Sequence, residues 1–154
     1  MRRFESRNSL PRVTEVVHRL PLFAGLDSEQ VTRLAGVCGV ATFAPGKIIF
    51  REGQEDRRMY VVLSGEVAIT VSESATLVGT LRSGECLGEM SLLTSTPHSV
   101  TATARTDVET AVLEHRDLTE LIRLRPDVGL CIYRNLAVGT GEKLKRLNAS
   151  LGSR

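Results

Sequence analysis

The middle of the chain is a series of short β-branched segments separated by glycines, and this pattern constrains the fold more than any other feature. Between about residues 42 and 114, Val67, Ile69 and Val71 show the alternation of a strand with one buried face. Ser64 and Gly65 lie between two such segments and predict a tight hairpin. Many short strands with frequent turns indicate an antiparallel roll or sandwich rather than a parallel sheet. The predicted strands are Lys47–Arg51, Met59–Ser64, Glu66–Ser72, Thr76–Leu81, Val100–Ala104 and Val108–Glu114.

The two flanking regions, about residues 11–38 and 116–149, have the apolar spacing of helices. Asp27, with Gln30 three residues later, predicts a capped helix start in the first region. In the second region Pro126 separates a short helix from a longer one, because the residue before a proline avoids the helical conformation. The chain is therefore expected to be mainly β with flanking α: an antiparallel β-roll with N-terminal helices, a C-terminal hinge and a long helix.

The long C-terminal helix carries two features of its own. Gly139 and Gly141 lie inside it, each costing about 1 kcal/mol relative to alanine, so we expect a bend at this point. Beyond them Leu144, Leu147 and Leu151 form an apolar stripe at spacings of three and four residues. The stripe fits two alternatives equally well, packing onto the roll or a dimer seam with a partner's helix.

Length and composition fit one soluble domain spanning residues 1–154. No stretch approaches the roughly 20 apolar residues that span a bilayer, so no membrane segment is expected. The three scattered cysteines indicate reduced thiols in a cytoplasmic protein. A formal charge of only +2, and the few residues after Leu147, argue against a DNA-reading module.

Residues 83–101 contain the chemically informative segment. Gly84 and Gly88 permit backbone conformations and close approaches that other residues cannot adopt. Residues 89–93 resemble a short helical turn, whose free N–H groups suit an anion. Glu89 at its start is able to accept hydrogen bonds from sugar hydroxyls, and Ser99 is able to donate one to a phosphate oxygen.

This segment resembles the phosphate-binding cassette of the cyclic-nucleotide-binding domain family, which includes bacterial catabolite activator proteins, kinase regulatory subunits and cyclic-nucleotide-gated channels. The similarity covers roughly Leu20 to Leu147. The segments that carry it outside the cassette are Leu20-Pro21-Leu22-Phe23, Pro45-Gly46, Glu52-Gly53 and Tyr60-Val61-Val62-Leu63-Ser64-Gly65-Glu66-Val67.

The resemblance implies a regulatory domain that binds cAMP or cGMP. Glu89 would bind the ribose 2′-hydroxyl, and backbone amides would hold the cyclic phosphate. The implied ligand-binding residues are Gly88, Glu89, Met90, Ser91, His98, Ser99 and Val100. Ligand would reposition the C-terminal helix, which would then contact a protein partner or a second copy of the chain.

The cassette departs from the family at one position, because His98 follows Pro97 where the family has arginine. Histidine offers the phosphate at most one contact and carries a full charge only below about pH 6.5. Losing a charge-assisted pair costs about 1.5–3 kcal/mol, or roughly a ten- to hundredfold loss of affinity. Arg105, one strand further along, is a candidate replacement that the sequence does not place at the site.

Three interpretations of the cassette remain open from the sequence. The domain binds a cyclic nucleotide, weakly, with His98 as a partial phosphate partner. Alternatively the site takes another small anion, or the cassette is a structural relic and the domain is a protein interaction module. An enzyme is not expected, since the isolated histidines His18, His98 and His115 form no metal-binding pair and no nucleophile motif is present.

Overall fold

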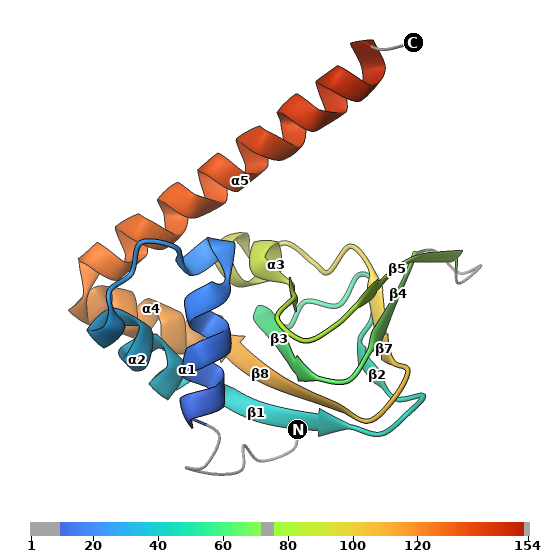
Figure 1. The fold of residues 1–154 in the computed structure, drawn as a ribbon, viewed down its shortest axis with the longest axis horizontal. Helices are drawn as coiled ribbons and strands as arrows, with labels where there is room; N and C mark the ends of the chain where they lie inside the picture. The colour runs from blue at the N-terminus through green and yellow to red at the C-terminus, as the bar shows by residue number, and fades with distance from the viewer. Residues whose placement is uncertain (1–9, 72–75, 153–154) are drawn as a thin grey trace.

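The computed structural model describes residues 10–71 and 76–152, and these residues form an antiparallel β-roll with helices at one end (Figure 1). In the described residues the strands form two four-stranded sheets, ordered β1-β8-β3-β6 and β2-β7-β4-β5. All of the pairings are antiparallel. The strands are β1 (Gly39–Phe43), β2 (Ile48–Phe50), β3 (Arg58–Ser64), β4 (Val67–Val71), β5 (Thr76–Leu81), β6 (Cys86–Leu87), β7 (Thr101–Ala104) and β8 (Val108–Glu114).

Helices precede and follow the roll, as the spacing of apolar residues predicts. Before it come α1 (Leu10–Arg19), the 3₁₀ turn η2 (Pro21–Phe23) and α2 (Ser28–Val37); after it come α4 (His115–Leu124) and α5 (Pro126–Gly152). A short helix, α3 (Glu89–Thr94), lies between the strands. Figure 1 shows α1, α2 and α4 grouped at one end of the roll, while α5 starts there and projects away from the body.

The start of α2 confirms the predicted capping box. The Asp27 side chain accepts a hydrogen bond from Gln30 N at 2.8 Å, and Asp27 N donates to Gln30 Oε1 at 2.8 Å. Two of the amide groups that a helix start leaves unpaired are thereby satisfied.

Alternate residues of β3 supply two separate apolar cores. Met59, Val61 and Leu63 face the helices, where they join α1, α2, α4 and the start of α5 in one cluster. Tyr60 and Val62 face the interior of the roll and join a second cluster. Because β3 is buried on both faces, it occupies an inner position in its sheet.

The predicted hairpin at Ser64 and Gly65 is wrong. β3 pairs with β6 and β8, whereas β4 pairs with β5 and β7, so this turn carries the chain from one sheet to the other. Gly65 has φ +91°, and a Cβ there would lie 2.2 Å from the backbone oxygen of Asp107. Gly65 therefore allows the close backbone approach at the point where the chain crosses between the sheets. A crossover of this kind and a hairpin turn have the same local sequence pattern.

The start of the roll, one short strand and the course of α5 also differ from the expectations. The roll begins at Gly39 rather than near residue 42, and β6 lies within the cassette segment, where no strand was predicted. The bend expected around Gly139 is absent, because α5 runs without interruption to Gly152. Two glycines lower the stability of a long helix without being sufficient to break it. Among the described residues, no helix has the length and apolar character needed to cross a membrane.

Candidate functional site

Within the cassette, Gly88 must be glycine for two reasons. Its φ is +88°, in the left-handed region, and it immediately precedes α3. A Cβ at Gly88 would lie 2.5 Å from the backbone oxygen of Arg58 and 2.9 Å from Cε1 of His98. The backbone of the cassette therefore rests directly against β3 and the His98 ring.

All seven residues that the sequence implied as ligand-binding surround one cavity of about 470 Å³. Its further lining residues are Phe50, Ile69, Cys86, Leu87, Thr96 and Pro97. Phe50 and Ile69 come from β2 and β4, so one wall of the cavity is the inner face of the roll. These two were not among the residues expected to bind ligand, although the alternation around Ile69 identifies its inward-facing position.

Two polar side chains of the cavity have no partner within the described residues. Glu89, the first residue of α3, is half-buried, and its carboxylate makes no hydrogen bond there. Ser91 follows two residues further along α3; the residue is only 2% exposed, and its Oγ has no hydrogen-bond partner within the described residues. A buried hydroxyl without a partner costs free energy, so this position favours a polar ligand group.

His98 is a buried side chain with a partner of its own. Its Nε2 lies 2.5 Å from Oδ1 of Asp56, and the two side chains are 2% and 9% exposed. The imidazole stacks on Phe50, with ring centroids 3.8 Å apart and an interplanar angle of 19°. Its backbone is held too, since His98 N donates to Gln54 O and Gly53 N donates to His98 O.

Asp56 is the centre of a small buried polar network. Its Oδ2 accepts hydrogen bonds from the Tyr60 hydroxyl at 2.9 Å and from Gln54 Nε2 at 3.0 Å, and its Oδ1 accepts from Arg58 N at 3.1 Å. Burial and the nearby Asp56 carboxylate raise the pKa of the Tyr60 hydroxyl, so Tyr60 remains a donor. Asp56 lies outside the cassette segment, so it was not among the residues expected at the site.

Among residues 10–71 and 76–152, no arginine or lysine lines the cavity. Arg105, the candidate replacement, donates instead to Thr80 Oγ1 at 3.1 Å. The guanidinium of Arg57 bonds Ser95 Oγ, directly after the end of α3, with Nε at 2.9 Å. The described residues contain no group of three or more side chains arranged to hold a metal ion.

The cassette helix is bonded to the start of the C-terminal helices. Nδ1 of His115, the first residue of α4, lies 2.7 Å from the backbone oxygen of Leu92 in α3. Leu92 and Leu93 also enter the helical core together with Leu118 and Leu121 of α4. A displacement of α3 would therefore change the contacts of α4 directly.

Comparison with known proteins identifies this architecture. The model of the cyclic nucleotide-binding domain matches residues 40–125, which is more than half of the chain. A cAMP-dependent protein kinase regulatory subunit of Yarrowia lipolytica is 32% identical over 94 residues, covering 61% of this chain. A cyclic AMP receptor protein of Thermus thermophilus is 32% identical over 134 residues, covering 85% of this chain. The chain spans 25% and 60% of the length of these two relatives.

A solved structure extends the likeness to the whole described fold. The N-terminal domain of a transcriptional regulator from Streptomyces coelicolor A3(2) superposes with a TM-score of 0.76 at 33% identity. The match covers 88% of this chain and 93% of that one. With a family model that matches residues 40–125 and a shared overall fold, the chain belongs to the cyclic nucleotide-binding domain family.

Proposed function

We propose that this chain is a non-catalytic regulatory domain that binds a cyclic nucleotide, cAMP or cGMP, in the cassette cavity and signals through its C-terminal helices. The observation that carries the proposal is the cavity itself, where two polar side chains, Glu89 and Ser91, lack partners within the described residues. In a finished core such groups are bonded, so a ligand is the natural partner.

The residues of the cavity suggest a division of roles. The Glu89 carboxylate accepts hydrogen bonds from the ribose 2′-hydroxyl, because an ionised carboxylate only accepts. Ser91, Ser99 and the backbone of the cassette face the phosphate side of the ligand, with His98 beneath them. The apolar wall formed by Phe50 and Ile69 supplies contact area without selecting a charge.

A second candidate function rests on a different observation. Because His98 is already bonded to Asp56, the cassette also fits a domain that has lost the nucleotide and acts as a protein interaction module. The two candidates differ in one measurable respect, since only the first requires Glu89 to contact a ligand.

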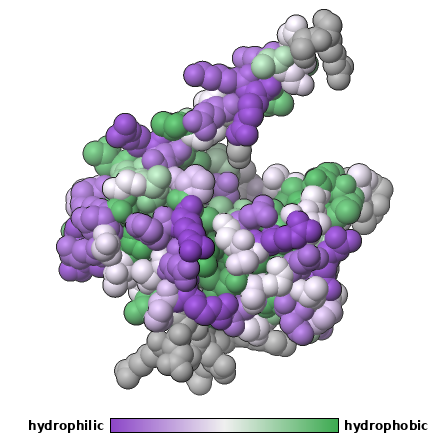
Figure 2. Space-filling model, in the orientation of Figure 1, coloured by the Kyte–Doolittle hydropathy of each residue, from purple (hydrophilic) through white to green (hydrophobic). Residues whose placement is uncertain are grey.

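For the output of the domain we propose homodimerisation through α5. Leu130, Tyr133, Leu144, Leu147 and Leu151 are 46–75% exposed and fall on one heptad seam, with Ala137 and Thr140 completing it. Figure 2 shows hydrophobic residues alternating with hydrophilic ones along this projecting helix. A seam of seven positions at spacings of three and four is the pattern of a two-stranded coiled coil.

The proposal also covers the cellular location of the domain and the kind of partner that it contacts. We place the domain in the cytoplasm, since its three cysteines, Cys38, Cys86 and Cys131, are unpaired. We treat residues 1–154 as one domain that acts without contacting DNA or a membrane, so that its partner is a protein.

Calorimetric titration tests the ligand. We expect cAMP or cGMP to bind with a dissociation constant in the micromolar range, weaker than an arginine-containing cassette would allow. Glu89→Gln should weaken binding of the cyclic nucleotide but leave its 2′-deoxy analogue unaffected, since the deleted hydroxyl is the group that Glu89 contacts. Glu142→Gln, on the exposed face of α5, is the control for the loss of one negative charge. If no cyclic nucleotide binds at millimolar concentration, the interaction module is the better account.

A further inference from the structure

The charge of the cassette cavity differs from what an anionic ligand requires. Within the part of the chain that the structure describes, the titratable side chains that line it are Glu89, His98 and Cys86, and neither arginine nor lysine is among them. The ring nitrogen Nε2 of His98 is taken by Asp56. His98 therefore already has a carboxylate partner before a ligand arrives, and the described lining offers a ligand no other cationic side chain.

Asp56 is held too firmly to move aside for a ligand. Four groups bond its carboxylate: His98, Tyr60, Gln54 Nε2 and the backbone N–H of Arg58. His98 is fixed in turn by stacking on Phe50, by backbone bonds to residues 53 and 54, and by the Gly88 backbone above its ring. Exchange of Asp56 for a phosphate would disturb this whole network.

We propose that Asp56 is a specificity-determining residue, and that with His98 paired to it the cavity takes an uncharged ribose-bearing ligand, a nucleoside, in preference to a cyclic phosphate. This inference rests on the proposed function, because it uses the same cavity and the same contact between Glu89 and ribose. Burying a phosphate charge without a free cation carries a desolvation cost that a neutral ligand avoids.

The unpartnered hydroxyl of Ser91 fits such a ligand. Its Oγ is buried and lacks a hydrogen-bond partner, and the residue lines the cavity close to Glu89. The 5′-hydroxyl of a nucleoside both donates and accepts, so it satisfies Ser91 in either orientation of the serine hydrogen. The ribose hydroxyls remain for Glu89, and neither contact needs a counter-ion.

The unmodified chain allows a test that depends on no variant. Calorimetry compares adenosine, cAMP and the uncharged methyl triester of cAMP, with the guanine series alongside. We expect the nucleoside and the triester to bind about tenfold more tightly than the cyclic phosphate, the effect of one unmatched charge. Equal or tighter binding of the cyclic phosphate overturns the inference.

Asp56→Asn tests the residue itself. It should raise the affinity for cAMP or cGMP by about tenfold, because His98 is then free to face the phosphate, and it should leave the affinity for the nucleoside unchanged. Glu55→Gln, an exposed neighbour, is the control for the change in net charge. Circular dichroism checks that Asp56→Asn folds, and the comparison of ligands on the native chain holds if it does not.

The two proposals fail in different ways. Suppose that cyclic nucleotides bind the native chain tightly, that Glu89→Gln weakens this binding and that Asp56→Asn leaves the affinity unchanged. The proposed function then stands, and the inference about Asp56 is overturned. If none of the nucleosides or nucleotides binds either protein, both are overturned.

Discussion

His115 Nδ1 lies 2.7 Å from the backbone oxygen of Leu92, which bonds the first residue of α4 to the cassette helix α3. A carbonyl oxygen only accepts, so Nδ1 carries the hydrogen. Nε2 then faces Thr119 Oγ1 at 3.3 Å. This is a direct polar link between the cassette helix α3 and the helices that follow the roll.

Removing the His115 donor should destabilise the domain. His115→Leu leaves the half-buried Leu92 oxygen without its partner, so we expect the free energy of unfolding to fall by about 1–2 kcal/mol. His115→Asn should restore most of the loss, because its amide offers a donor close to the position of Nδ1. Urea unfolding followed by circular dichroism measures both, with His18→Leu at an exposed position as the control. Equal stability of His115→Leu and the native chain would show that the bond contributes nothing.

The two glycine environments predict opposite effects of alanine. Gly88→Ala places a Cβ 2.5 Å from the Arg58 oxygen at a φ of +88°, so it should cost about 2 kcal/mol or more and weaken ligand binding. Gly139→Ala, in α5 with open space around it, should add about 1 kcal/mol of helix stability. Thermal unfolding compares the two. A stabilising Gly88→Ala would mean that the cassette does not pack against β3 as described, and a hinge at Gly139 would show as an altered ligand response in Gly139→Ala.

Local sequence patterns predict much of the secondary structure, but the wrong hairpin shows that they do not predict which strands pair. The alternation in β4, the capping box at Asp27 and the helix at Glu89–Thr94 are all set by residues close in the chain. The pairing of β3 with β6 and β8 depends on burial of both faces of β3 in the folded roll. The turn residues Ser64 and Gly65 carry no information about this pairing.

For the cavity too, the residues close together in the chain could be predicted, and a contact between distant residues could not. The seven cassette residues were predicted from one continuous segment and a family resemblance, and they do surround one cavity. Asp56 could not be predicted, because it lies 42 residues from His98 in the chain. Their contact depends on the bonds of Gly53 and Gln54 to the His98 backbone, which form only in the folded roll.

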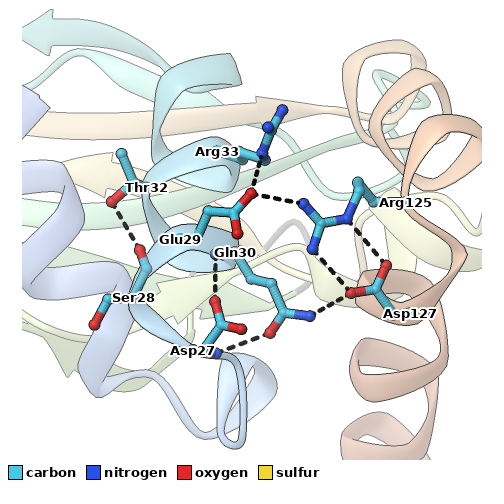
Figure 3. A network of polar contacts seen from close by, with 8 residues as sticks. All are labelled: Asp27, Ser28, Glu29, Gln30, Thr32, Arg33, Arg125 and Asp127. Carbon is cyan, nitrogen blue, oxygen red and sulfur yellow. Dashed lines mark hydrogen bonds and ion pairs between the residues drawn. The ribbon is translucent and has the colours of Figure 1, made fainter.

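The junction of α2 with the C-terminal helices should respond to acid. Figure 3 shows Arg125 between Glu29 and Asp127, with Gln30 donating to Asp127. Hydrogen bonds from Arg125 and Gln30 lower the pKa of Asp127 to about 2. Its pKa in the folded chain lies below the ordinary value near 4, so its contribution to stability is present above pH 4 and is lost as the pH falls toward 2.

Asp127→Asn should therefore reduce stability at pH 6 and flatten the loss of stability between pH 4 and pH 2. Thermal unfolding across this range measures the difference, and salt should diminish it because the groups are exposed. Asp107→Asn removes an exposed carboxylate elsewhere and should leave the acid dependence as it is. An unchanged slope in Asp127→Asn would show that the junction makes no net contribution.

The heptad seam on α5 gives the last prediction. Leu144→Glu with Leu147→Glu places charges at two positions where a coiled-coil partner would pack, so we expect a dimer to become a monomer by light scattering after size-exclusion chromatography. Val138→Glu is the matched control, because Val138 is 53% exposed on the same helix but lies off the seam. Its dimer should persist. A chain that is already monomeric at high concentration, or a dimer that survives both seam substitutions, would mean that α5 has a different partner, and the exposed leucines would then be the first positions for mapping it by cross-linking.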